Sequence, residues 1–373
     1  MAKKPNIRFA GFEDDWEQRK VSELCSISTG KSNTQDKSED GEYPFYVRSP
    51  IIERSTKYLY DEEAVITVGD GVGTGKVFHY VNGKYDLHQR CYRMYGFSDE
   101  LNAHYFYHTF SKLFYKRVMA MTAKTSVDSV RLEMIADMEI PTPTIEEQIK
   151  IGTYFDHLDH LITLHQRKCD ELKKVKKFML QKMFPKKGEK NPEIRFDGFT
   201  NDWEQRKLGE IAIEILAGGD IDKEKVVDDG AYPIYANALT NDGIVGYYND
   251  YYRVKAPAVT VTGRGEVGHA QARMTDFTPV VRLLAIRSSN DCYFLENAIN
   301  NHKVVVESTG VPQLTVPQLS SYDICFPKDI EEEKKIGAYY KKLDRLITLH
   351  QRKSEELKNV KKYMLQNMFA KGE

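Results

Sequence analysis

A chain of 373 residues is too long for one ordinary hydrophobic core, and its length fits two domains with connecting helices. The formal net charge of -1 argues against a strongly basic nucleic-acid-binding protein. Hydrophobic residues make up 41% of the chain, but they form no long unbroken run that would predict a membrane span.

Cysteine usage and the N-terminal sequence bear on the compartment. The five cysteines form no CxxC pair and are odd in number, so neither a disulfide framework nor a zinc module is predicted. The opening residues, MAKKPNIRF, lack the apolar core of a signal peptide. These features predict a cytoplasmic protein that does not associate with a membrane.

A short segment near the N-terminus occurs twice. Asn6–Lys20 reads NIRFAGFEDDWEQRK and Glu193–Lys207 reads EIRFDGFTNDWEQRK, with 11 of 15 positions identical. Each copy carries one of the two tryptophans, Trp16 and Trp203. A repeated tryptophan is more often a packing anchor than a ligand platform. We therefore predict that it joins each half of the chain to a long helix.

The stretches that follow the repeats differ from each other. Val21–Thr144 and Leu208–Asp329 are 124 and 122 residues long and share little sequence. Short β-branched and aromatic runs alternate with Gly, Asn and Asp, which predicts mixed sheet with long loops. Each stretch is large enough for its own core. Near-identical flanks around different middles indicate that the two middles recognise two different things.

Two glycine-rich runs superficially suggest phosphate binding. In Gly69–Lys76 the first glycine of a phosphate loop is replaced by Asp70, and Val77 follows the lysine in place of Ser or Thr. Gly263–Gly268 reads GxGxxG, but no clear helix or later acidic residue completes a dinucleotide site. We predict tight loops between strands, which could present Lys76, Arg264 and His269 outward.

The longest repeat predicts two helices. Ile145–Phe184 and Ile330–Phe369 are identical at 28 of 40 positions and contain no proline. Thr144 and Asp329 each stand three residues before a glutamate, which is the spacing of a capping box. Apolar residues recur every three or four positions, which is typical of a coiled coil. The chain then divides into a first recognition domain (1–144), a first helix (145–184), a linker (185–192), a second recognition domain (193–329) and a second helix (330–373).

Catalytic constellations are not recognisable in the sequence. It has no GxSxG motif, no paired Cys and His or carboxylates that spacing singles out, and no amino-methyltransferase signature. We predict no catalytic residue and no metal ligand in this chain.

This order of elements resembles the specificity subunit of type I restriction-modification systems. The residues that carry the resemblance are the proline-flanked helix entry IPTPTIEEQIKIG (Ile140–Gly152) and the repeated RFxGFxxDWEQRK. The second entry differs, reading FPKDIEEEKKIG with Glu333 where the first has Gln148. The resemblance implies an α+β protein in which a long antiparallel two-helix coiled coil separates two α/β target-recognition domains, related by a pseudo-two-fold internal repeat.

The resemblance also implies a function and partners. Each domain would read one half of a bipartite, asymmetric target in double-stranded DNA, and the coil would set the spacing between the halves. Two modification (methyltransferase) subunits would bind the repeats and bring S-adenosylmethionine. Restriction (translocase/endonuclease) subunits would add ATP and magnesium, so no cofactor is expected in this chain.

Candidate contact residues follow from this interpretation. Arginine pairs with guanine, and asparagine or glutamine with adenine, when the major groove is read. The predicted DNA contacts are polar residues of the divergent loops: Arg48, Lys76, Arg90, Lys124, Thr125, Ser126, Asn237, Arg264, His269, Gln271, Arg273 and Gln313. The predicted partner contacts are residues of the repeats: Trp16, Arg19, Trp203, Arg206, Gln166, Arg167, Gln351 and Arg352.

Two other functions remain open from the residues alone. A single-chain endonuclease or methyltransferase with tandem domains would need a catalytic constellation that the sequence does not display. A tandem scaffold or ligand-binding protein without DNA specificity would fit the near-zero net charge. Salt-sensitive DNA binding together with modification subunits separates the last alternative from a DNA-reading subunit.

Overall fold

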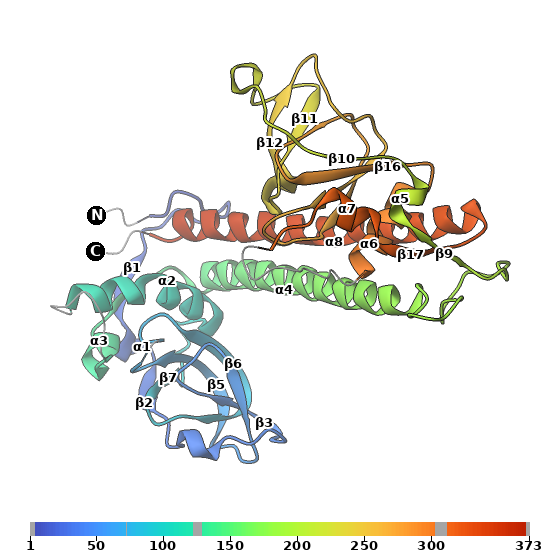
Figure 1. The fold of residues 1–373 in the computed structure, drawn as a ribbon. Coiled ribbons are helices and arrows are strands. Elements are labelled where there is room, and N and C mark those ends of the chain that lie inside the picture. The colour runs from blue at the N-terminus through green and yellow to red at the C-terminus, as the bar shows by residue number, and fades with distance from the viewer. Residues whose placement is uncertain (1–3, 72, 122–128, 303–311, 371–373) are drawn as a thin grey trace. The chain divides into compact units, whose positions relative to one another are not determined.

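The computed structural model describes residues 4–71, 73–121, 129–302 and 312–370. The chain divides into two compact units (Figure 1). Unit 1 comprises Met1–His165 and Arg352–Glu373, and unit 2 comprises Gln166–Gln351. Each unit therefore contains one variable middle and parts of both long helices.

The two predicted helices are α4 (Ile145–Lys182) and α8 (Ile330–Asn367). Helix α4 ends two residues before the predicted position 184, and α8 ends at Asn367 although the helix was predicted to continue to position 373. Within unit 1, Lys361 of α8 donates to both carboxylate oxygens of Asp159 in α4, at 2.5 and 2.6 Å. Within unit 2, Lys176 of α4 donates to both oxygens of Asp344 in α8, at 2.7 and 2.8 Å. The start of each helix thus pairs with the end of the other, so the predicted antiparallel coil is confirmed.

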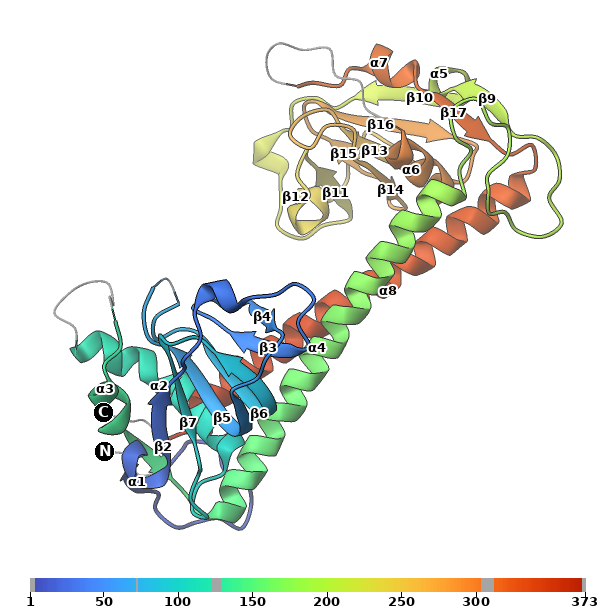
Figure 2. The same ribbon diagram turned by 90° about the horizontal axis from the view of Figure 1, so that it is seen from below.

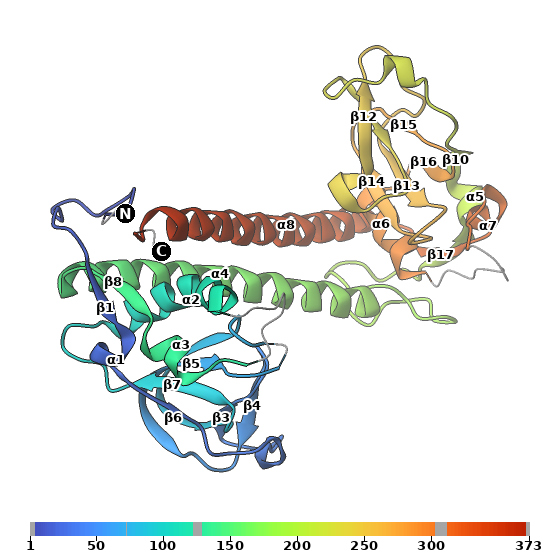
Figure 3. The ribbon, with the colours of Figure 1, turned by 90° about the vertical axis from the view of Figure 1, so that its left-hand side faces the viewer.

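Unit 1 is built on one large sheet. Its strands follow the order β2-β7-β5-β6-β3-β4, antiparallel except for β3 and β6, and a separate pair joins β1 to β8 (Figure 3). Helix α2 covers the sheet (Figure 2). Phe78 of β6 meets Phe110 and Phe114 of α2 edge to face. The elements are β1 (Glu17–Lys20), α1 (Val21–Leu24), β2 (Ser26–Thr29), η1 (Thr34–Asp36), β3 (Tyr43–Tyr46), β4 (Ile52–Ser55), β5 (Tyr60–Val68), β6 (Phe78–Leu87), β7 (Cys91–Tyr95), α2 (Ala103–Met121), α3 (Leu132–Ala136) and β8 (Glu139–Thr142).

Unit 2 repeats this topology with a divided sheet. Its strand orders are β10-β16-β13-β14, β12-β11-β15 and β17-β9. The short strands β14 and β15 together take the place of β6, and β11 pairs in parallel with β15 as β3 does with β6. The elements are β9 (Glu204–Lys207), α5 (Leu208–Ile211), β10 (Ala212–Ala217), η2 (Lys223–Lys225), β11 (Tyr232–Tyr235), η3 (Thr240–Gly243), β12 (Ile244–Tyr248), β13 (Ala258–Thr262), β14 (Ala270–Arg273), β15 (Thr278–Pro279), β16 (Leu283–Ser288), α6 (Cys292–Asn301), α7 (Val316–Ser320) and β17 (Asp323–Phe326).

Each core is closed by an aromatic residue that follows the end of a long helix. Phe369, just beyond α8, lies with its ring centroid 5.8 Å from Tyr105 and 5.5 Å from Phe155 in unit 1. Phe184, just beyond α4, lies 5.5 Å from Phe294 and also contacts Trp203 in unit 2. Each core therefore requires the end of one helix and the start of the other.

A buried glutamate at the start of each long helix binds the front repeat. Glu147 is fully buried and accepts hydrogen bonds from Arg8 Nε at 2.7 Å, Arg8 Nη2 at 2.8 Å and Trp16 Nε1 at 3.2 Å. In unit 2, Glu332 is bound in the same way by Arg195 and Trp203. The predicted role of the tryptophans as packing anchors is confirmed.

These glutamates correct the predicted capping boxes. Thr144 Oγ1 does accept a hydrogen bond from the backbone nitrogen of Glu147 at 3.4 Å, and Asp329 Oδ1 accepts one from Glu331 at 2.9 Å. The carboxylates of Glu147 and Glu332, however, turn to the arginine and tryptophan of the front repeat. A buried carboxylate gains more from a two-pronged guanidinium contact than from one backbone amide.

A buried sequence difference between the helix entries, Gln148 against Glu333, preserves a contact with the segment that precedes α2 in unit 1 and α6 in unit 2. Gln148 is buried, donates to the carbonyl oxygens of Glu100 and Pro143, and accepts from the backbone nitrogen of Asn102. Glu333 at the matching position can only accept, and it does so from Asn290 Nδ2 at 2.7 Å and from the backbone nitrogen of Asp291 at 3.1 Å. A side-chain donor thus replaces two backbone acceptors, and the helix start stays joined to the segment before α6.

Replacing Glu147 tests the anchor. Glu147→Gln leaves Arg8, whose side chain is 12% exposed, beside a neutral amide. Removing one partner of a buried ion pair costs about 3–5 kcal/mol. We expect hydrogen exchange to speed up in unit 1 peptides, while Glu332→Gln should do the same in unit 2. The exposed neighbour Glu146→Gln is the control, and unchanged exchange in unit 1 would contradict the anchor role.

The partly buried Glu296 of α6 provides a pH test. Burial raises its pKa from 4.5 to about 7, although the positive charge of Lys176 opposes the shift. Because the folded-state pKa is the higher one, this group favours folding fully below pH 4.5, and the benefit is lost as pH rises through 7. Glu296→Gln should therefore stabilise unit 2 at pH 8 by on the order of 3 kcal/mol and change little at pH 4.5. Denaturant unfolding at both pH values measures this difference, and equal effects at both would contradict it.

Candidate nucleic-acid interface

A polar hollow at one end of the unit 1 sheet gathers predicted DNA contacts. Arg48 follows β3, and Arg90 stands between β6 and β7. Both line a hollow of about 540 Å³, whose other lining residues are Asn33, Thr34, Gln35, His88 and Gln89. Arginine, glutamine and asparagine are the side chains that read base edges in the major groove.

Asp70, the second residue after β5, holds the two arginines. Arg48 Nη1 lies 3.2 Å from Asp70 Oδ1, and Arg90 Nη1 lies 2.5 Å from Asp70 Oδ2. The Asp70 side chain is 16% exposed, against 44% for Arg48 and 60% for Arg90. Burial raises the pKa of Asp70, but the hydrogen bonds from Arg90 and Arg48 outweigh this effect and lower it. The carboxylate is therefore charged at neutral pH, with the two guanidinium groups on its solvent side.

His88 holds the backbone of Arg90 through a hydrogen bond. Burial lowers its pKa, and the positive charge of Arg48 lowers it further, so the imidazole is neutral at pH 7. Its Nδ1 accepts a hydrogen bond from the backbone nitrogen of Arg90 at 3.1 Å. The ring thus fixes the turn that carries Arg90.

The loop after β13 in unit 2 corresponds to the loop after β5 in unit 1, because a glycine approaches another backbone segment closely in both. A Cβ atom on Gly69 would lie 2.7 Å from the carbonyl oxygen of Arg90, and one on Gly263 would collide with that of Arg282. The two glycines occupy the same place, so Arg264 stands where unit 1 has Asp70. The backbone bonds from His88 to Tyr46 and from Val280 to Tyr235 match as well. The corresponding pairs are therefore Arg48 and Asn237, Asp70 and Arg264, and Arg90 and Arg282.

The candidates of unit 2 take different roles at this end. Asn237 is held at both ends of its amide, because Oδ1 accepts from Gly263 at 2.8 Å and Nδ2 donates to the Val281 carbonyl at 3.1 Å. Arg264 lies in the loop that Asn237 supports, and in the described part of the chain its buried Nε has no hydrogen-bond partner. Gln313 is exposed and stands next to Leu314, which bonds to Gly263. As placed, Asn237 shapes the loop, and Arg264 and Gln313 are the residues beside it that a ligand could meet.

Arg273 requires a correction. Its side chain is 5% exposed, bonds to Asp242 at 3.0 Å and Thr260 at 3.1 Å, and stacks 3.7 Å above the ring of Tyr235. Gln271 accepts a hydrogen bond from Arg273 at 2.7 Å and donates to the same Asp242. Arg273 is therefore a packing residue of the sheet, not a base contact, because every side of its guanidinium is covered.

The remaining candidates are dispersed. His269 is exposed, and the ammonium of the exposed Lys76 lies 4.9 Å from the ring of Tyr115. Lys124, Thr125 and Ser126 lie outside the described residues.

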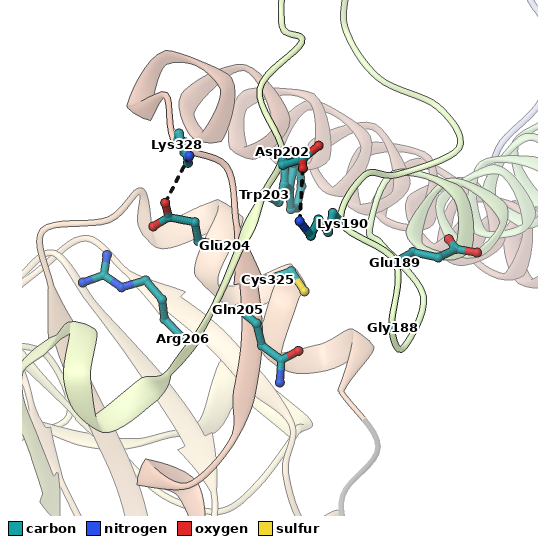
Figure 4. A pocket seen from close by; sticks show the side chains of 10 residues that line it. All are labelled: Gly188, Glu189, Lys190, Asp202, Trp203, Glu204, Gln205, Arg206, Cys325 and Lys328. Carbon is teal, nitrogen blue, oxygen red and sulfur yellow. Dashed lines mark ion pairs between the residues drawn. The ribbon is translucent and has the colours of Figure 1, made fainter.

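The front repeat forms a second polar surface, seen most clearly in unit 2. A cavity of about 600 Å³ is lined by Gly188, Glu189, Lys190, Asp202, Trp203, Glu204, Gln205, Arg206, Cys325 and Lys328 (Figure 4). Lys190 pairs with Asp202 at 3.4 Å, as Lys4 pairs with Asp15 at 3.4 Å in unit 1. Arg206 is exposed here on β9. Both units thus present the same strand, Glu-Gln-Arg-Lys.

The other predicted partner contacts divide into buried and exposed residues. Trp16 and Trp203 are 2% and 3% exposed, so as placed they pack inside their units. Arg19 is bound to Glu23 at 3.1 Å and to Glu100 at 2.9 Å. The helix residues are all exposed: Gln166, Arg167, Gln351 and Arg352.

Sequence reasoning missed several residues of the hollow and its counterpart. Asn33, Gln35 and Gln89 line the hollow of unit 1, and Gln89 directly precedes the predicted Arg90. Arg282 has a φ of +72°, a left-handed conformation that is uncommon for an arginine and is often found at functional sites. A polar run between Gly30 and Gly41 is the available signal for Asn33 and Gln35, and nothing in the sequence marks Gln89 or Arg282.

In the described part of the chain, no helix is long and apolar enough to span a membrane.

Comparison with known proteins assigns the family. The family model described as the type I restriction modification DNA specificity domain matches the chain twice, over residues 13–174 and 200–359. The putative type I specificity subunit S.MpnORF507P of Mycoplasma pneumoniae is 24% identical over 332 residues, covering 86% of each protein. The type I restriction enzyme MjaVIII specificity subunit of Methanocaldococcus jannaschii is 22% identical over 403 residues, covering 96% of this chain and 93% of that protein.

A solved structure shares the fold. The crystal structure of a type I restriction-modification S subunit from M. genitalium superposes with a TM-score of 0.78 over 99% of this chain and 100% of that one, at 14% identity. The predicted fold is thereby confirmed, and the family match confirms the predicted role in DNA specificity in place of catalysis. The chain belongs to the type I restriction-modification DNA specificity family and carries two copies of its specificity domain.

Proposed function

We propose that unit 1 and unit 2 each read one half of a bipartite, asymmetric sequence in double-stranded DNA. The observation that carries this proposal is the difference between matching positions at the same end of the two sheets. Unit 1 has two arginines joined by an aspartate, whereas unit 2 has Arg264 in place of that aspartate. Different side chains on one scaffold select different bases, so the two half-sites differ.

We further propose that two modification subunits bind this chain, one on each front repeat. The support is that exposed residues of β1 and β9 are identical, although the middles that follow them differ. Those subunits would carry S-adenosylmethionine, and restriction subunits would carry ATP and magnesium. Phosphate contacts made by the partners would explain how a DNA-reading chain keeps a net charge of -1.

Methylome sequencing of cells that express this chain with its modification subunit tests the function. We expect methylated adenine at one asymmetric bipartite motif, and its loss when this chain is deleted. An assembled complex without any motif that depends on this chain would refute the proposal.

Arginine replacements test which unit reads which half. Arg48→Ala or Arg90→Ala should relax one half-site by about 1–3 kcal/mol of base discrimination, because a bidentate contact to guanine is lost. Arg264→Ala should relax the other half-site. The readout is the methylated motif of each variant. Relaxation of both half-sites by a single replacement would contradict the assignment.

The repeated strand can be tested by stoichiometry. Arg206→Ala should lower the number of bound modification subunits from two to one, because only the unit 2 surface is changed. Native mass spectrometry of the purified complex counts the subunits. Arg345→Ala is the control, since this exposed arginine of α8 lies outside the front repeat and is not shared between the two long helices, where His160 stands at the matching position. Two subunits retained by Arg206→Ala would argue against this docking surface.

A further inference from the structure

The hollow of unit 1 contains a carboxylate, although a surface that carried only positive charge would bind DNA more tightly. Asp70 lies beneath Arg48 and Arg90 and binds one guanidinium with each oxygen. A negative charge at this place repels phosphates, so it lowers affinity for any DNA sequence.

The ion pairs of Asp70 contribute little to the stability of the fold, so stability does not explain the presence of an aspartate here. Ion pairs to side chains as exposed as Arg48 and Arg90 contribute about 0–1 kcal/mol. The loop itself is held by backbone bonds, from Gly69 to Arg90 at 2.9 Å and from Val130 to Gly69 at 2.7 Å. The loop therefore has its conformation without the carboxylate, and what the carboxylate fixes is the direction of the two arginines.

The geometry leaves each guanidinium able to bind a base. Arg48 and Arg90 each donate to Asp70 through Nη1, which is one of the nitrogens of a planar group with five N–H donors. A side chain that is already oriented loses less entropy on binding, about 0.5–1.5 kcal/mol per side chain. An arginine whose positive charge is offset by a carboxylate also binds a phosphate less strongly.

We propose that Asp70 is a specificity-determining positioning residue, which orients Arg48 and Arg90 toward guanine bases and weakens their contacts with phosphates. This inference rests on the proposed reading of DNA by unit 1. Unit 2 has Arg264 at the matching position, so this device acts on one half-site alone.

The test uses the full chain in complex with its modification subunits. Asp70→Asn keeps the size of the side chain but removes its charge. Binding to DNA without the motif should tighten, and its dependence on log salt concentration should steepen by about 1–2. Discrimination at guanines of the unit 1 half-site should fall about tenfold, while the unit 2 half-site keeps its sequence. Asp70→Glu should restore part of the discrimination because it keeps the charge.

Glu53→Gln is the matched control, since it removes an acid that pairs with Lys37 in the same unit, away from the front repeat. It should leave discrimination unchanged. Unaltered discrimination by Asp70→Asn, or an equal loss at both half-sites, would overturn the role of Asp70 while the wild-type motif persists. A wild-type complex without any motif would overturn the proposed function and this inference together.

Discussion

The contact on which both units depend is a buried glutamate at the start of a long helix. Glu147 and Glu332 have no solvent exposure, and a charge removed from water is tolerated only when it is fully paired. Arg8 and Arg195 supply that pairing from the front repeat, and an indole N–H supplies a further bond. The front repeat is therefore fixed to the helix, because loss of either partner would leave the glutamate charge buried and unpaired.

The same repeat also binds the end of the other helix. Ile7 donates to the carbonyl of Asn367 in unit 1, and Ile194 donates to that of Lys182 in unit 2, both at 2.9 Å. With Phe369 and Phe184 filling the two cores, each unit is closed by chain segments that are distant in sequence. The buried anchor residues of the repeats have partners that are also repeated, so a change on one side would leave a buried charge or a cavity.

The helices and the tryptophan anchors could be predicted because they depend on periodicity and on repeated residues, whereas the antiparallel pairing of the helices came from the family resemblance. The candidate site could be predicted only in part. Arg48 and Arg90 are close together because two distant loops meet at Asp70, and no spacing in the sequence shows such a contact. Arg273 looked like Arg90 as a polar residue near a glycine loop, yet it lies over Tyr235 inside the sheet. Whether an arginine faces solvent or a ring is decided by tertiary packing, which a local pattern does not record.

The near-zero net charge of the chain is mirrored in the hollow of unit 1, where an acid pairs with two arginines. The sequence contains 54 basic and 55 acidic residues, and one of the acids, Asp70, holds the two arginines of the unit 1 hollow. A chain with free arginines would bind phosphates along any duplex, and a genome offers a vast excess of such sites. Selectivity is the difference between the affinities for the target and for other sequences, so a DNA-binding protein becomes more selective when its affinity for other sequences falls. In the proposed role of Asp70, an acid beside the two arginines of the hollow lowers that background, and the phosphate contacts that overall affinity needs would come from the partner subunits.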